Sequence, residues 1–211
     1  MDILSRINTI KSRIEELKAK DAALENFGAG DNEWYNMTGH HYEFHPVLSE
    51  EELTAAEKKL EITFPEEYRA FLKHAGNGGA GPAWGLFTST EGWPNEPLLE
   101  ICPDFCSMEF PYGNEYADGM YAELANDFFF RGPYHEPCGG FVQLANYGHE
   151  MRALLIISGE QRGKVWLQDE GNSMTPFVQK VDGKITGVSF LDWYNLWLDE
   201  CLVPGAPASQ F

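Results

Sequence analysis

The feature that most constrains how this 211-residue chain folds is a pair of short amphipathic segments between Leu48 and Gly79. Ser49 and, three residues later, Glu52 form the pattern of a capping box, in which two side chains satisfy backbone N–H groups at the start of a helix. Apolar residues then follow at helical spacing, at Leu53, Ala56 and Leu60. The pattern predicts a helix that buries one face.

A second helix is predicted to begin at Pro65, because proline suits the first turn of a helix, where its missing N–H costs nothing. Glu66 and Glu67 complement the positive end of the helix dipole, and Gly76 is a natural terminator. The apolar residues lie at positions i, i+3, i+4 and i+7: Tyr68, Phe71, Leu72 and Ala75. Two amphipathic helices joined by a short link are stable only when they pack against other elements, and we expect these downstream.

Three strands are predicted further along the chain, over residues Phe141–Ala145, Ala153–Ser158 and Lys164–Gln168. The second contains the apolar run Leu154–Ile157, which is typical of a central strand buried on both faces. Turns between the segments favour antiparallel pairing. Pro176–Val181, which precedes a hairpin-type turn, is interpreted as an edge strand.

Other segments complete the expected fold. Ser189 and Asp192 form a second capping-box pattern and begin a closing helix with a broad aromatic face. Ala83–Ser89 is predicted as a strand and Met120–Phe129 as a short helix. The sequence therefore predicts a single α+β domain, in which a mostly antiparallel sheet is packed with helices.

The N-terminal residues carry a narrow apolar seam with charged residues between its members. The seam consists of Ile3, Ile7, Ile10, Ile14 and Leu17. It predicts an amphipathic helix that either pairs with a second copy of the chain or packs onto the domain's own surface. We favour packing onto the domain's own surface. We accordingly expect a monomer or a weak dimer.

Three segments of the chain, taken in order, resemble the SUKH superfamily: the helical pair in Leu48–Gly79, the strands in Gly139–Asp169 and the closing helix in Ser189–Leu202. This superfamily contains yeast cell-wall-assembly regulators and bacterial immunity proteins that neutralise polymorphic toxins. The resemblance implies that the chain is an immunity protein for a cognate toxin. The alternative is a regulatory protein-interaction module without a toxin partner.

The apolar seam and the resemblance together give the expected domain organisation. An N-terminal amphipathic helix over residues 1–27 and a linker over residues 28–47 precede a SUKH-like α+β domain over residues 48–202, and a flexible tail follows over residues 203–211. The N-terminal helix and the long segment Glu91–Pro137 depart from the simplest family members, so no interface position is transferred from the family.

The net charge of −18 is unevenly distributed, since Ala75–Phe130 contains nine Asp or Glu residues and no Lys or Arg. Such a surface repels nucleic acid, which requires Lys and Arg to replace its counterions. It attracts basic proteins and accelerates their association. General solubility is the alternative explanation for the acidic composition.

Tyrosines alternate with carboxylates in the middle of this acidic segment, and aromatic side chains are enriched at interface hot spots. We expect them to bind a basic partner such as a nuclease- or deaminase-type toxin; the alternative is a loop insertion whose aromatic residues pack on the core. The expected protein-binding residues are Glu109, Tyr112, Glu115, Tyr116, Asp118 and Tyr121.

No motif in the sequence indicates an enzyme or a cofactor site, so neither is expected. Gly76–Gly81 matches G-x-G-x-x-G, but it follows a predicted helix instead of a strand and is interpreted as a turn. The histidines in His40–His45 are interpreted as part of a polar loop or strand. Three cysteines and one histidine in the middle of the chain allow two interpretations, a loosely spaced zinc site or ordinary thiols. These residues are Cys102, Cys106, His135 and Cys138.

The expected location is the cytoplasm. No apolar run approaches the ~20 residues that span a bilayer, and the N-terminus lacks the apolar core of a signal peptide. We expect the four cysteines to be reduced thiols in that compartment, and we expect no membrane partner.

Overall fold

The computed structural model describes residues 1–34, 36–89, 102–124, 139–148, 151–169 and 173–203. Its helices are α1 (Ile3–Lys20), α2 (Glu50–Lys59), α3 (Glu66–His74), α5 (Asn114–Leu124) and α6 (Phe190–Leu202). Its strands are β1 (Phe141–Gly148), β2 (Met151–Ile156), β3 (Val165–Gln168), β4 (Met174–Pro176), β5 (Val178–Val181) and β6 (Lys184–Gly187).

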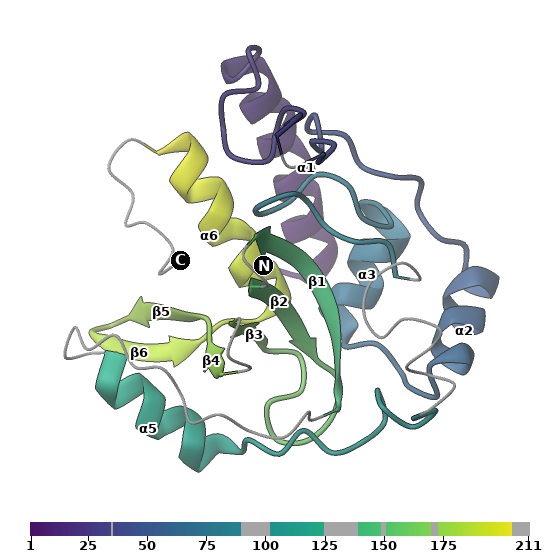
Figure 1. Cartoon of the computed structure of the whole chain (residues 1–211), viewed down its shortest axis with the longest axis vertical. Coiled ribbons are helices and arrows are strands. Elements are labelled where there is room, and N and C mark those ends of the chain that lie inside the picture. Colours follow the sequence, from purple (N-terminus) through teal and green to yellow (C-terminus); the bar gives the residue numbers. More distant parts are fainter. Residues whose placement is uncertain (35, 90–101, 125–138, 149–150, 170–172, 204–211) are drawn as a thin grey trace.

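An antiparallel sheet in the order β1-β2-β3-β4 forms the centre of the fold, as Figure 1 shows. β2 lies between β1 and β3, and its residues Leu154, Leu155 and Ile156 are fully buried. The prediction of a central strand buried on both faces is thus confirmed. β5 and β6 form a separate two-stranded ribbon whose turn, Asp182–Gly183, has positive φ at both residues, as a type I′ hairpin requires.

Helices cover the sheet from two sides. α1, α3 and α6 pack against one another, whereas α5 lies beside β4 and β6 on the opposite side of the molecule (Figure 1). Phe71 of α3 and Phe190 of α6 are fully buried and their rings meet edge to face at 5.1 Å. The α+β class with a mostly antiparallel sheet and an added N-terminal helix is therefore confirmed.

The apolar seam of α1 packs within the chain. The last four of its five members, Ile7, Ile10, Ile14 and Leu17, are all buried. Ion pairs flank the seam: Arg6 binds Glu67 of α3 at 2.5 Å and Asp192 of α6 at 2.6 Å, and Arg13 binds Asp199 of α6. Of the two roles open to the seam, the structure shows packing onto the domain's own surface.

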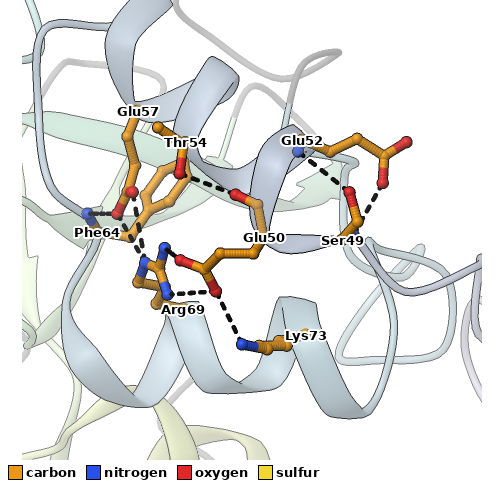
Figure 2. Close-up of polar contacts among 8 residues, drawn as sticks. All are labelled: Ser49, Glu50, Glu52, Thr54, Glu57, Phe64, Arg69 and Lys73. Atoms are coloured by element: carbon orange, nitrogen blue, oxygen red, sulfur yellow. Dashed lines mark hydrogen bonds and ion pairs between the residues drawn. The ribbon is translucent and has the colours of Figure 1, made fainter.

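A polar network joins α2 to α3 (Figure 2). Glu50 pairs with Arg69 and with Lys73, and hydrogen bonds from these two cations lower the pKa of the Glu50 carboxyl to about 2. Glu57 accepts hydrogen bonds from Arg69 at 3.1 Å and from the backbone N–H of Phe64 at 2.9 Å. The ion pairs of Glu50, which is half exposed, add little to stability, so they mainly fix how the two helices lie against each other.

The capping boxes expected from the sequence form fully at α2 but only in part at α6. At α2 the reciprocal hydrogen bonds of Ser49 and Glu52 are both present. At α6 the Ser189 side chain accepts from the N–H of Asp192 and also donates to its carboxylate. That carboxylate binds Arg6, so the expected capping box is only half formed among the described contacts.

Two predicted elements differ in the structure. Ala83–Ser89 forms no strand: Leu86 makes isolated bridges to Gly79 and Ala145, because Ala83 and Gly85 have positive φ and interrupt an extended conformation. The helix expected over Met120–Phe129 begins earlier, at Asn114, and is described as far as Leu124; residues 125–129 lie outside the described part of the chain.

Candidate functional site

Exposed carboxylates surround the start of α5. Glu115 and Asp118 lie three residues apart, on neighbouring positions of one helix face, and both are exposed, as is Glu109 just before the helix. We call these three residues the acidic face. Glu160, from the turn after β2, accepts a hydrogen bond from the backbone N–H of Asn114 at 2.6 Å and adds a fourth carboxylate at the first turn of α5.

The predicted tyrosines lie differently from the carboxylates. Tyr112 is only 6% exposed, and its ring stacks on Trp166 of β3 with a centroid distance of 5.8 Å. Tyr116 is half-buried and stacks on the same indole at 6.1 Å. Tyr121 lies in the last turn of α5. The structure therefore brings the carboxylates to the surface, whereas Tyr112 and Tyr116 anchor the segment to the sheet.

Several carboxylates on the helical side of the molecule are paired with cations. Glu50, Glu67 and Asp199 each bind an Arg side chain on the helical side of the molecule. For Glu109, Glu115 and Asp118, by contrast, no ion pair occurs among the described residues. Within the described part of the chain, the acidic face is therefore not neutralised by an intramolecular ion pair.

A concave site lies between α6, the β5–β6 ribbon and the ends of β1 and β2. It has a volume of about 730 Å³. We call it the aromatic groove; its aromatic lining is Phe27, Tyr147, Phe177, Trp193 and Trp197, and its polar lining is Asn26, Gln179, Lys180 and Glu200. The aromatic face of the closing helix is visible in the sequence, but the groove depends on the ribbon beside it, and sequence reasoning missed it.

The comparison with protein families identifies the domain. A model of the SMI1 / KNR4 family (SUKH-1) matches residues 47–183, nearly two thirds of the chain. The chain belongs to this family. The matched span runs from the residue before Leu48 to the turn between β5 and β6, so α1 and α6 of this SUKH-1 protein lie outside it. No curated protein and no solved structure matches the chain.

The histidine-rich segment of the SUKH-1 protein contributes to the core. His40 is buried, and its ring meets those of Tyr42 and Trp197 edge to face, at 5.0 and 5.8 Å. Its Nδ1 accepts a hydrogen bond from the Tyr42 N–H at 3.0 Å. His41 instead lies 3.0 Å from Asp31. Burial, together with the neighbouring His41, lowers the pKa of His40 to about 4.

This burial makes stability depend on pH. The ordinary pKa of histidine is 6.5, so between about pH 6.5 and 4 the unfolded chain binds a proton that the folded chain does not. We expect stability to fall over that range, with His40 contributing a loss of about 2–3 kcal/mol by pH 4.5. Urea unfolding at pH 7.5 and 4.5 should show a smaller loss for His40→Asn than for the wild type. Equal losses of stability in the two proteins would mean that His40 does not contribute to the pH dependence.

The cysteines show no arrangement for metal binding within the described ranges. Cys106 is buried, contacts the Phe141 carbonyl oxygen at 3.6 Å, and has its pKa raised to about 12, chiefly by burial, so it is a protonated thiol. Cys102 is half-buried, whereas His135 and Cys138 lie outside the described residues. No group of three or more potential metal ligands occurs among the side chains that the structure describes.

None of the helices in the described ranges combines the length and the apolar character needed to cross a membrane. The longest, α1, has 18 residues and includes charged side chains on its outer face.

Proposed function

We propose that this SUKH-1 protein is an immunity protein that binds a cognate polymorphic toxin and blocks it with the acidic face. The observation that carries the proposal is the exposure of Glu109, Glu115 and Asp118 without an intramolecular cation among the described residues. Membership of the SMI1 / KNR4 family supports a role in protein–protein interaction.

The mechanism follows from the charge. A toxin that acts on nucleic acid presents a basic catalytic surface, because it must hold phosphates. Carboxylates that meet this surface steer the two proteins together and penalise partners of the wrong charge. Since Glu115 and Asp118 lie on a helix anchored by Tyr112 and Tyr116, they are held in place before the toxin arrives, which reduces the entropy lost on binding. The bound protein would then cover the catalytic surface sterically.

Charge reversal tests the proposal. We expect the double substitution Glu115→Lys and Asp118→Lys to lower the association rate with the toxin encoded beside this gene by about 10–10³-fold at low salt, and to reduce the salt dependence of that rate. Stopped-flow mixing of the purified proteins at several ionic strengths measures both. The matched control is Glu33→Lys with Glu61→Lys, which changes the net charge equally at exposed positions elsewhere.

Two results would overturn the proposal. Binding and salt dependence could be the same in the double variant as in the control, in which case the acidic face does not meet the toxin. Alternatively, the neighbouring genes could encode no toxin and the protein could give no protection, which would favour the regulatory interaction module.

A further inference from the structure

The aromatic groove runs along one edge of the β5–β6 ribbon. Successive side chains of a strand point to opposite faces of its sheet, so a groove over one face alone would be lined by every second residue of β5. Three successive residues line it instead, Val178, Gln179 and Lys180. In Figure 1, β6 lies toward α5 and β5 toward α6. The edge of β5 therefore forms one side of the groove, and α6 forms the other.

The backbone of β5 has hydrogen-bonding groups that β6 does not use. Val181 pairs with Lys184 beside the two-residue turn, and the next pair along the ribbon is Lys180 with Ile185. Residues that flank such a turn exchange backbone hydrogen bonds, whereas the next pair does not. The N–H and C=O groups of Lys180 therefore point away from β6, and by the same alternation those of Val178 do as well. No backbone group in the described ranges binds them from the other side.

The side of the groove that faces this edge is apolar. Leu196 of α6 and Tyr147 of β1 line it and are half-buried, and Trp193 and Trp197 of α6 line it with only 2% and 8% of their surface exposed. Apolar side chains that entered here would remove the remaining exposed surface from water, which favours binding. An unpaired strand edge and an apolar groove thus lie next to each other.

The edge carries a positive charge in a chain of net charge −18. The Lys180 side chain is exposed and forms no ion pair with another described residue. An exposed lysine on an edge strand discourages non-specific pairing, whereas opposite charges that face each other across two strands attract. Salt screens exposed charges beyond about 8 Å, so this local charge selects a strand with a carboxylate opposite Lys180.

An extended polypeptide is the ligand that satisfies all these features. A helix pairs its own backbone groups internally and would leave those of β5 without partners. An extended segment that adds to a sheet edge forms main-chain hydrogen bonds and places alternate side chains in the adjoining groove. We propose that the edge of β5 and the aromatic groove bind an extended segment of a partner protein as a third strand of the ribbon, with apolar side chains at alternate positions and a carboxylate that faces Lys180. This interaction goes beyond the proposed function, because the acidic face lies on the other side of the ribbon.

The probe is a blocked peptide of about six residues, enough to pair with the four residues of β5. It has valine at alternate positions, threonine between them and one central glutamate. Amide hydrogen exchange of the full chain is followed by NMR with and without the peptide. We expect the amide protons of Val178 and Lys180 to exchange about tenfold more slowly or less when the peptide is bound, because they acquire hydrogen-bond partners.

Backbone methylation of the peptide separates strand addition from side-chain binding. Alternate amides of a paired strand face its partner, so two peptides are made, each N-methylated on one alternate set. We expect one of them to bind at least about tenfold more weakly than the parent peptide and the other to bind nearly as well. Equal affinity of the two methylated peptides would overturn the inference.

Variants at one position separate the backbone contribution from the charge. Lys180→Pro removes the outward N–H, which edge strands tolerate, and should abolish saturable binding. Lys180→Gln keeps the N–H and should weaken binding of the glutamate peptide severalfold, without affecting a peptide with glutamine in its place. Lys184→Gln is the matched control, because it removes the same charge from the same ribbon at an exposed residue outside the groove lining. Equal effects of Lys180→Gln and Lys184→Gln would refute the pairing with Lys180.

The free protein tests the other possible occupants of the edge. Amide protons of Val178 and Lys180 that are already protected without peptide would overturn the inference. Protection that rises with protein concentration would assign the edge to a second copy of the chain, and protection independent of concentration would assign it to another segment of the same chain. The two functional proposals fail separately: peptide binding without toxin binding would retain this inference and refute the immunity proposal, and the reverse result would do the opposite.

Discussion

Replacing Phe71 by alanine is expected to lower the free energy of unfolding by about 3–5 kcal/mol. The side chain is fully buried, and its ring lies 5.1–5.8 Å from those of Phe44, Phe190 and Tyr194. Alanine removes these contacts and leaves a cavity between α3 and α6, which the surrounding aromatic rings are too rigid to fill. Guanidinium or urea unfolding, followed by far-ultraviolet circular dichroism, measures the change.

Phe27→Ala is the matched control for that variant, because the same side chain is removed where it is 62% exposed. We expect a loss below about 1 kcal/mol there. A similar small loss for Phe71→Ala would mean that α3 does not pack against α6 as described. A loss of the expected size places the helical pair in the cooperative core, as the amphipathic pattern of the sequence predicts.

We expect Ile10→Asp to lower the free energy of unfolding by at least as much, more than about 4 kcal/mol. Ile10 is fully buried in the seam of α1, so the new carboxylate is either desolvated or forces α1 off the domain. Leu4→Asp introduces the same charge into the same helix at a residue that is 49% exposed, and we expect it to change stability by less than about 1 kcal/mol. Urea unfolding of both variants measures the difference.

The Ile10 experiment also tests the two roles of the seam. If α1 packs within its own chain, the unfolding midpoint of the wild type is independent of protein concentration. A midpoint that rises with concentration, together with a tolerated Ile10→Asp, would instead indicate that the seam pairs two copies.

The sequence predicted those parts of the fold that depend on contacts between near neighbours or on apolar periodicity. The capping box of Ser49 and Glu52 joins residues three positions apart, and the buried run in β2 needs only its own composition. The start of α5 was predicted too late because it depends on Glu160, which is 46 residues away from Asn114 in the sequence. No local pattern contains that contact.

The same limit applies to the candidate sites. Composition identified the acidic segment, and Glu115 and Asp118 are indeed exposed. It could not indicate that Tyr112 points inward, since the partner of Tyr112 is Trp166 on a distant strand. The aromatic groove escaped prediction for the same reason, because its walls meet only after α6 and the β5–β6 ribbon have packed together.

The ion pairs of α1 have a consequence for how the protein folds during its synthesis. Arg6 binds Asp192 and Arg13 binds Asp199, across 186 residues of chain in each case, and the seam between them packs beside α6. During synthesis α1 leaves the ribosome long before α6 is translated, so its apolar seam can meet α3 early but lacks α6 for most of that time. Such long-range closure is slow and leaves apolar surface exposed to aggregation. The domain therefore becomes fully native only after its last helix has emerged, and a nascent chain stalled before residue 190 would retain an exposed α1 for chaperones to bind.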